Sequence, residues 1–113
     1  MVEGAWAPDR GDIIWLDFDP QSGHEQRGRR PALILSPQAY NERAGLALAC
    51  PISTQIKGYP FEVQLPRGLD TSGVVLADQV RSIDWRARRA HAKGRASDDV
   101  VGQVVALVES LLS

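Results

Sequence analysis

Two strongly apolar runs and the charged loop between them decide the fold: DIIWLDF at residues 12–18, PALIL at residues 31–35, and HEQRGRRP at residues 24–31. The first run is rich in β-formers and predicts a strand, which the following Asp-Pro step ends. The second run is apolar throughout and predicts a strand buried on both faces. Three arginines and one glutamate fall within six residues of the loop, so we expect the chemistry there. A hairpin loop that is only solvated would carry similar charges, so the loop alone does not distinguish a functional site from a solvated turn. The rest of the chain has to distinguish them.

Working outward, turn residues divide the remaining chain into short segments. Further strands are predicted over residues 46–52, 61–65, 73–77 and 85–91. In the last of these, arginine and alanine alternate, which predicts an amphipathic strand with Arg86 and Arg88 on one face. Residues 1–10 mix proline, glycine and charge around Trp6, and we expect a loosely held arm there.

Two helices are indicated by their end signals. Ser36 followed by a proline is typical of an N-cap, and Gly45 makes a plausible C-terminal stop, so a short helix is expected between them. Ser97 caps a terminal helix, with two aspartates in its first turn where the helix dipole favours anions. Its apolar residues recur at helical spacing and form one stripe, which must lie on the sheet or on a partner. The stripe comprises Val100, Val101, Val104, Val105, Val108, Leu111 and Leu112.

These elements predict a mainly β (α+β) fold: a small, strongly bent antiparallel sheet or half-open barrel with a short inserted helix and a C-terminal helix. At 113 residues the chain should form a single domain over residues 1–113. Thirteen basic and fourteen acidic residues leave the net charge near zero, so a nucleic-acid partner must be bound locally. The start lacks the layout of a signal peptide and no apolar run is long enough to cross a bilayer, so we expect a cytoplasmic protein without membrane contact. Cys50, the single cysteine, lies in an apolar stretch and is interpreted as a small buried hydrophobe.

Four stretches carry a resemblance when they are taken together and in order. They are GDIIWLDFDP (11–20), EQRGRRPA (25–32), CPISTQ with KGYPF (50–55 and 57–61), and LADQVRS with WRAR (76–82 and 85–88). The sequence resembles the MazF/PemK family of toxin endoribonucleases from bacterial toxin-antitoxin modules. Each motif alone is weak, but four in register are specific, and the terminal helix stands in the family's place.

The resemblance implies an SH3-like barrel with an added helix and a homodimer that binds RNA along the dimer face. It implies metal-free, cofactor-free cleavage of single-stranded RNA, with mRNA as the expected target, at a short sequence, which would inhibit translation and growth. A cognate antitoxin would block the RNA face with a disordered acidic tail, and DNA would be contacted only through that antitoxin. Carried over position by position, the active-site arginine is Arg30, the active-site threonine is Thr54 and the loop glutamate is Glu25. Arg27 and Arg29 add positive charge where family members vary.

RNA carries its own nucleophile, the 2'-hydroxyl, so cleavage needs a proton acceptor, charge on the phosphate oxygens and a donor for the leaving 5'-oxygen. Arg30 and the Thr54 hydroxyl can donate to phosphate oxygens. A guanidinium has a pKa above about 12 and is a reluctant base. We therefore favour Glu25 as the base, with Arg30 as clamp and possible acid. By resemblance, the products are a 2',3'-cyclic phosphate, or its opened 3'-phosphate, and a 5'-hydroxyl.

Other polar residues in these motifs are predicted to bind RNA, each against a structural alternative. The RNA-binding set is Arg27, Arg29, Ser53, Lys57, Tyr59, Asp78, Gln79 and Arg86. Asp78 and Gln79 could read base edges or simply end a strand. Phe61, Trp15 and Trp85 are more typical of core packing than of base stacking. His24 and His91 could form a two-histidine ribonuclease, but solvated or structural roles are favoured.

No residues have the spacing of a metal site, and no metal is expected. Two other functions stay open: a non-catalytic barrel that binds protein or nucleic acid, as the gyrase-poisoning toxins do on a similar fold, and an inactive relative kept as an antitoxin-binding decoy. The combination of Glu25, Arg30 and Thr54 favours the ribonuclease over the first alternative.

Overall fold

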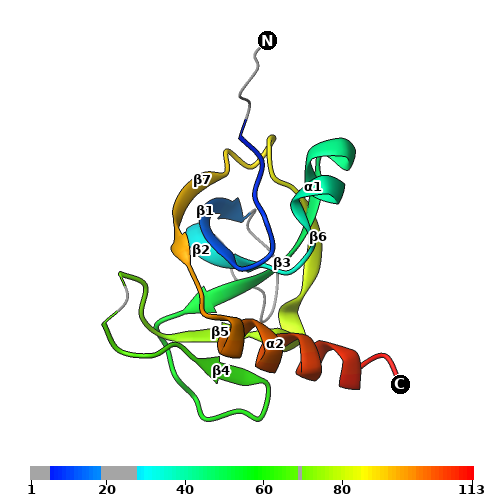
Figure 1. Ribbon diagram of the computed structural model, residues 1–113. Helices are drawn as coiled ribbons and strands as arrows, with labels where there is room; N and C mark the ends of the chain where they lie inside the picture. Colours follow the sequence, from blue (N-terminus) through cyan, green and yellow to red (C-terminus); the bar gives the residue numbers. More distant parts are fainter. Residues whose placement is uncertain (1–5, 19–27, 69) are drawn as a thin grey trace.

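The computed structural model describes residues 6–18, 28–68 and 70–113 (Figure 1). Within them, seven strands form one sheet in which every recorded pair is antiparallel, with the order β4-β5-β3-β2-β1-β7 and β6 also paired to β3. The strands are β1 (Asp12–Phe18), β2 (Gly28–Ile34), β3 (Leu46–Ser53), β4 (Glu62–Gln64), β5 (Val74–Leu76), β6 (Arg81–Asp84) and β7 (His91–Arg95). The helices are α1 (Gln38–Ala44), a short 3-10 turn η1 (Ala77–Gln79) and α2 (Asp98–Ser110).

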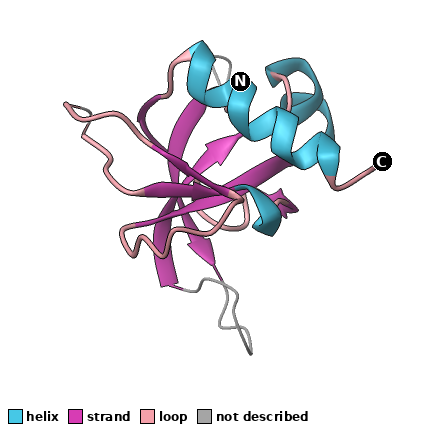
Figure 2. Ribbon diagram, turned by 90° about the horizontal axis from the view of Figure 1, so that it is seen from below, coloured by secondary structure: helices cyan, strands magenta, loops and turns pink. Residues whose placement is uncertain are grey.

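Strand β3 bends the sheet. Its first residues pair with β6, and Ala49 to Pro51 pair with β2. From Ile52 onward β3 pairs with β5 instead. The sheet is therefore bent but not closed, with β4 and β7 at its two ends. Figure 2 shows the bent strands together with the helices. The predicted mainly β architecture, with a short inserted helix and a C-terminal helix, is confirmed.

Alternate side chains of β1, β2 and β3 enter two separate cores, because successive strand residues point to opposite faces. The α2 core comprises Ile13, Leu33, Leu35, Cys50, Ile52, Val63, Leu65, Val75, Ala77, Ala96, Val100, Val101 and Val104. The Trp85 core comprises Ala7, Ile14, Leu16, Phe18, Ala32, Ile34, Ala47, Ala49, Ile83 and Trp85. Burial of β2 on both faces from Ala32 to Ile34 confirms that prediction for the second apolar run.

Helix α2 begins as predicted, since the Ser97 Oγ accepts a hydrogen bond from the Val100 backbone N–H at 3.2 Å. The first half of the apolar stripe is buried in the chain's own α2 core, through Val100, Val101 and Val104. Toward the end of the stripe Leu112 is 81% exposed. No helix in the described parts of the chain is long and apolar enough to cross a membrane.

The predicted strand over residues 85–91 is wrong, because residues 85–89 form a turn between β6 and β7. Backbone bonds from Arg88 N to Asp84 O and from Ala90 N to Trp85 O, at 3.0 and 2.9 Å, fold this segment back on itself. The alternation of arginine and alanine does not reflect a strand. Each arginine instead reaches a different acceptor around the turn.

Helix α1 ends as predicted, with Gly45 at φ 72° in the left-handed region that favours glycine. Its start differs from the prediction, since Pro37 occupies the N-cap position and no side chain caps the helix. The Ser36 hydroxyl is used elsewhere: it donates to the Asn41 Oδ1 at 2.6 Å and accepts from the Leu48 N–H at 2.9 Å.

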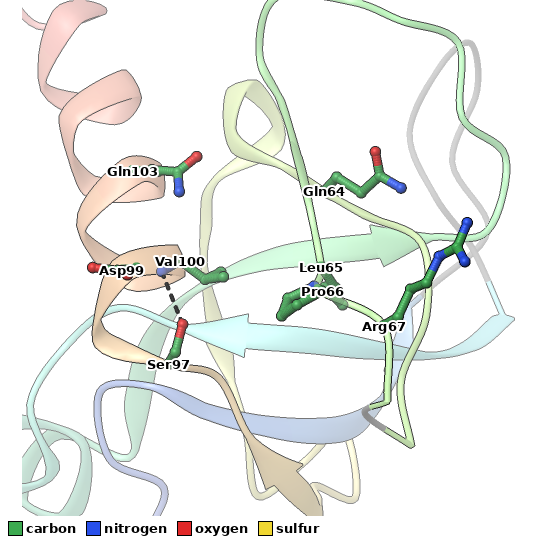
Figure 3. A pocket seen from close by; sticks show the side chains of 8 residues that line it. All are labelled: Gln64, Leu65, Pro66, Arg67, Ser97, Asp99, Val100 and Gln103. Carbon is green, nitrogen blue, oxygen red and sulfur yellow. Dashed lines mark hydrogen bonds between the residues drawn. The ribbon is translucent and has the colours of Figure 1, made fainter.

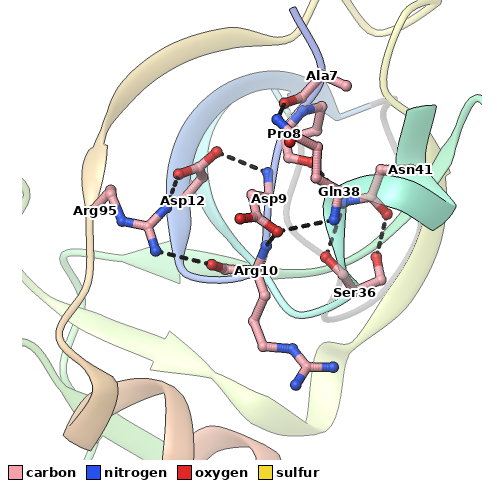
Figure 4. A network of polar contacts seen from close by, with 9 residues as sticks. All are labelled: Ala7, Pro8, Asp9, Arg10, Asp12, Ser36, Gln38, Asn41 and Arg95. Carbon is pink, nitrogen blue, oxygen red and sulfur yellow. Dashed lines mark hydrogen bonds and ion pairs between the residues drawn. The ribbon is translucent and has the colours of Figure 1, made fainter.

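The predicted loosely held arm is also wrong where the structure describes it, in residues 6–10. Figure 4 shows this segment tied to α1 by hydrogen bonds. Its Ala7 is 3% exposed within the Trp85 core, and the Trp6 ring meets the Trp85 ring edge-on at 5.8 Å between centroids. The polar composition that suggested an arm supplies acceptors for α1 instead.

Candidate active site

Arg30 lies within β2, because β2 begins at Gly28 rather than at Pro31. It is opposite Leu16 of β1 and is half-buried. By strand alternation it is on the same face as Ala32 and Ile34, so it continues the line of side chains that enters the Trp85 core. The arginine is therefore carried by a paired strand and not by a loop.

Ser53 and Thr54 lie where β3 ends, and their side chains differ in environment. Ser53 is 6% exposed, and its hydroxyl accepts a hydrogen bond from the Gln55 N–H at 3.0 Å. Thr54 is exposed, and its hydroxyl has no hydrogen-bond partner within the described residues. Ser53 thus stabilises the bend, whereas the Thr54 hydroxyl is available to a ligand.

The sheet bends between these two positions. The last recorded β2–β3 pair is Ala32 with Pro51, and two further steps of that antiparallel register would set Arg30 against Ser53. Recorded pairing with β2 ends at Pro51, and on its other edge β3 passes from β6 to β5. Arg30 and the 53–54 bend therefore flank the fork at which β2 and β3 separate.

Asp17 is a residue that the sequence analysis missed, and it binds two arginines. Its carboxylate accepts from Arg29 Nη1 and from Arg89 Nε, both at 2.7 Å. Hydrogen bonds from Arg89 and Arg29 lower the pKa of Asp17 to about 2. Arg88 Nη1 also donates to the Asp17 backbone carbonyl at 3.1 Å. Two guanidinium groups on the Asp17 carboxylate and a third on its carbonyl give the end of β1 a net positive charge.

The loop after Thr54 is folded around a glutamate. The Glu62 carboxylate accepts from the backbone N–H groups of Lys57 and Gly58. The Lys57 ammonium is 5.7 Å from the centre of the Tyr59 ring, and Tyr59 is 59% exposed. A cation beside an exposed ring suits a nucleotide, so the predicted roles of both residues are compatible with their positions.

The other predicted residues lie on η1 and on the turn that follows β6, and η1 contacts β3 as well as α2. Asp78 is exposed and Gln79 half-buried in η1, which packs near α2. The Arg86 guanidinium stacks on the Trp85 ring at 4.5 Å and donates to the Glu42 carbonyl of α1 at 3.3 Å. These contacts place Arg86 at α1, and its RNA-binding role stays a prediction. Glu25, Arg27 and His24 lie outside the described residues.

Three aromatic residues and the single cysteine lie in or beside the two cores. Trp85 is 4% exposed and donates from Nε1 to the Asn41 carbonyl at 3.0 Å, which confirms its core role. Phe61 packs against the α2 core, as expected. Cys50 is fully buried, and burial raises the pKa of its thiol to about 12. Trp15 is half-buried under the Lys93 ammonium, which is 5.1 Å from the centre of its ring. Among the residues described, no three His, Cys, Asp or Glu side chains are grouped as a metal would need.

A hollow of about 380 Å³ lies elsewhere, between the end of β4 and the start of α2 (Figure 3). Its lining residues are Gln64, Leu65, Pro66, Arg67, Ser97, Asp99, Val100 and Gln103. None of them is a predicted site residue, and Ser97 already caps α2. This hollow is therefore separate from the Arg30 and Thr54 positions.

Solved MazF structures share this bent open sheet with a terminal helix. The crystal structure of MazF from Deinococcus radiodurans superposes with a TM-score of 0.92 at 56% identity, covering 96% of this chain and 98% of that one. The MazE-MazF complex from the same organism (Form-II) matches with a TM-score of 0.87, also at 56% identity, over 96% and 97% of the two chains. The endoribonuclease toxin MazF of Escherichia coli K12 is 50% identical over 107 residues, which are 95% of this chain and 96% of that toxin.

The chain belongs to the family of PemK-like, MazF-like toxins of type II toxin-antitoxin systems, whose model matches residues 9–112. The matched range extends beyond the four motifs and includes α2.

Proposed function

We propose that this chain is a MazF-like endoribonuclease toxin that cleaves single-stranded RNA at a short sequence, without a metal ion, by attack of the RNA's own 2'-hydroxyl. One observation carries the proposal. In a chain of this toxin family, Arg30 of β2 and an exposed Thr54, whose hydroxyl has no partner in the described part of the chain, flank the same fork in the sheet.

The reaction needs no nucleophile from the protein. The 2'-oxygen loses its proton to a base and bonds to phosphorus, and the bond from phosphorus to the 5'-oxygen breaks after a phosphorane-like transition state. The 5'-oxygen takes up a proton, which leaves a 2',3'-cyclic phosphate and a 5'-hydroxyl. Glu25 is our candidate for the base, and Arg30 is the candidate for the acid as well as for the charge clamp.

Arg30 and Thr54 would act on the charge that develops on the phosphate oxygens. A preorganised donor is effective because it does not have to reorient as the charge forms, and removing one typically costs about 2.7 to 4 kcal/mol. Pairing of β2 with β1 fixes the Arg30 backbone, and the Ser53–Gln55 hydrogen bond fixes the bend that carries Thr54. Both supports favour preorganisation.

RNA contacts would extend from this fork along exposed polar residues. Lys57 and Tyr59 offer a cation and a ring to a single-stranded segment. The arginines around Asp17 offer positive charge to the backbone phosphates. Exposed Thr54, Lys57 and Tyr59 follow one another along the chain after β3, which suits contacts to an extended single strand.

The partner proposed for this toxin is a cognate antitoxin with an acidic, disordered tail. The MazE-MazF complexes of Deinococcus radiodurans are assemblies of a related toxin with its antitoxin. An acidic tail would complement the basic edge and fold as it binds. We further propose a homodimer, a cytoplasmic location, and contact with DNA only through the antitoxin.

The test is cleavage of a mixed-sequence RNA in EDTA by the wild type and by the variants Arg30→Ala and Thr54→Ala, with the ends mapped. Arg43→Ala is the matched control, because Arg43 is an exposed arginine in the last turn of α1. We expect cleavage that survives chelation, leaves 5'-hydroxyl ends, falls at least a hundredfold in both site variants and is unchanged in the control.

A substrate with a 2'-deoxy substitution at the mapped site completes the experiment, since it removes only the nucleophile. It should resist cleavage while still binding. Absence of cleavage by a folded wild type over diverse RNAs would contradict the ribonuclease and favour a non-catalytic binding module.

A further inference from the structure

Gly73 lies directly against the Ser53–Thr54 bend and has no part in the mechanism above. β3 and β5 pair through Ser53 and Val74, and the next step of that register sets Gly73 opposite Thr54. On its other side, the Gly73 carbonyl accepts a hydrogen bond from the Leu65 N–H at 2.9 Å. Gly73 is therefore held between two neighbouring segments at the level of Thr54.

The space beside Gly73 admits no side chain. A Cβ there would lie 2.1 Å from the Ser53 carbonyl oxygen, 2.8 Å from the Ser53 carbonyl carbon and 3.1 Å from the Thr54 Cα. The first distance is 0.9 Å short of the 3.0 Å below which a neighbour must shift. All three atoms are backbone, so no change of rotamer can relieve the contact. The φ of Gly73 is also +113°, a conformation that other residues rarely adopt.

We propose that Gly73 is a positioning residue for Thr54: its bare Cα lets the Ser53–Thr54 peptide take the bend that presents the Thr54 hydroxyl to the RNA phosphate. The inference rests on the proposed function, because it requires the Thr54 hydroxyl to serve cleavage. Ser53 holds the same bend from within, through the hydrogen bond from Gln55 N–H to its hydroxyl. Gly73 acts from the adjacent segment, because its lack of a side chain leaves space for the Ser53 carbonyl group.

The expected effect follows from the displacement. An alanine at position 73 must move the Ser53 carbonyl by about 1 Å, and a misplacement of about 1 Å can cost on the order of a hundredfold in rate. We expect Gly73→Ala to lower kcat about a hundredfold. The KM for RNA should change little, because Lys57, Tyr59 and the arginines around Asp17 are not displaced.

Two control variants separate this effect from backbone strain and from lost stability. Gly68 also has a positive φ, +93°, which an alanine rarely adopts, but nothing lies within 4 Å of the added Cβ. Gly68→Ala therefore tests backbone strain alone. Val74→Ala removes a side chain that is 1% exposed next to Gly73, so it tests destabilisation of β5 without pushing on Thr54. Both should keep a near-wild-type kcat at temperatures where thermal melts show them folded.

A double-mutant cycle of Gly73→Ala and Thr54→Ala decides the question. If Gly73 acts through Thr54, the double variant cleaves at the rate of Thr54→Ala alone, since nothing remains to be misplaced. If the two losses multiply, or if Gly73→Ala fails to fold while Val74→Ala folds, Gly73 serves stability only and the inference is overturned. A wild type that does not cleave, or a fully active Thr54→Ala, would instead refute the proposed function or the role of Thr54 in it.

Discussion

Removal of the Asn41 side chain should destabilise the protein without touching its chemistry. Asn41 is fully buried in α1, and its Nδ2 donates to the Pro8 and Ser36 carbonyls at 2.8 and 3.0 Å (Figure 4). Its Oδ1 accepts from the Ser36 hydroxyl at 2.6 Å. Asn41→Ala removes all three hydrogen bonds and leaves their partners buried.

The magnitude follows from those three bonds. At about 1 kcal/mol each, their loss amounts to about 3 kcal/mol. The higher helix propensity of alanine offsets roughly 0.5 kcal/mol, so the free energy of unfolding should fall by about 2.5 kcal/mol. For a chain of this length, that corresponds to a drop in Tm of roughly 10 °C.

The assay is thermal and urea unfolding followed by circular dichroism, with RNA cleavage measured at 25 °C. Gln38→Ala is the matched control, because this exposed residue of the same helix makes one side-chain hydrogen bond, from Nε2 to the Ala7 carbonyl at 2.8 Å. It should lose about 1 kcal/mol or less. The Asn41 reasoning is refuted if Asn41→Ala loses no more stability than Gln38→Ala, or if kcat falls while the protein remains folded.

Three further predictions concern pH, thiol chemistry and the terminal helix. The pKa of Asp17 falls from 3.8 to about 2 beside its two arginines, so the ionised carboxylate should stabilise the fold above about pH 4 and lose that contribution as the pH drops toward 2. In urea melts, the stability of Asp17→Asn should depend less on pH in that window than the stability of the wild type. An unchanged pH dependence would contradict the ion pairs. Burial raises the pKa of the Cys50 thiol to about 12, so the thiol should resist iodoacetamide at pH 8 in the folded protein and react on unfolding. Mass spectrometry measures the labelling, and rapid labelling of the native state would refute the burial of Cys50. Val104→Ala, at a fully buried position of α2, should lower the free energy of unfolding by roughly 2 kcal/mol. Leu112→Ala, at an 81% exposed position, should lower it by less than about 0.5 kcal/mol. Equal losses in chemical denaturation would indicate that Leu112 makes a contact that this fold lacks.

The sequence predicted those elements whose signals are local. β1 has the predicted limits, Ser97 caps α2, and Gly45 ends α1, because strand composition, an N-cap hydroxyl and a left-handed glycine each act within a few residues. The strand predicted over residues 85–91 was wrong because alternating arginine and alanine residues occur both in strands and in turns whose arginines reach distant acceptors. Those acceptors, in β1 and α1, are known only from the tertiary fold.

The site was predictable only in part for the same reason. Arg30 and Thr54 were found through motifs, but their common location at the fork depends on the point at which β3 leaves β2 for β5. Gly73 was assigned only as the start of a strand, since nothing in its own neighbourhood in the sequence indicates a close approach to Ser53. A glycine that faces the Ser53–Thr54 bend from a neighbouring segment becomes apparent only when the register is known.

The start of β2 at Gly28 gives two adjacent arginines different chemical environments. In a loop, Arg29 and Arg30 would be interchangeable cations. In a paired strand they point to opposite faces, so Arg29 meets the Asp17 carboxylate at 2.7 Å, whereas Arg30 is opposite the apolar Leu16. Asp17 partly neutralises Arg29 and fixes it in place, and it thereby holds the end of β2 against β1 next to Arg30. An acidic residue in this basic region therefore supports the strand that carries Arg30, the arginine that we propose for RNA cleavage.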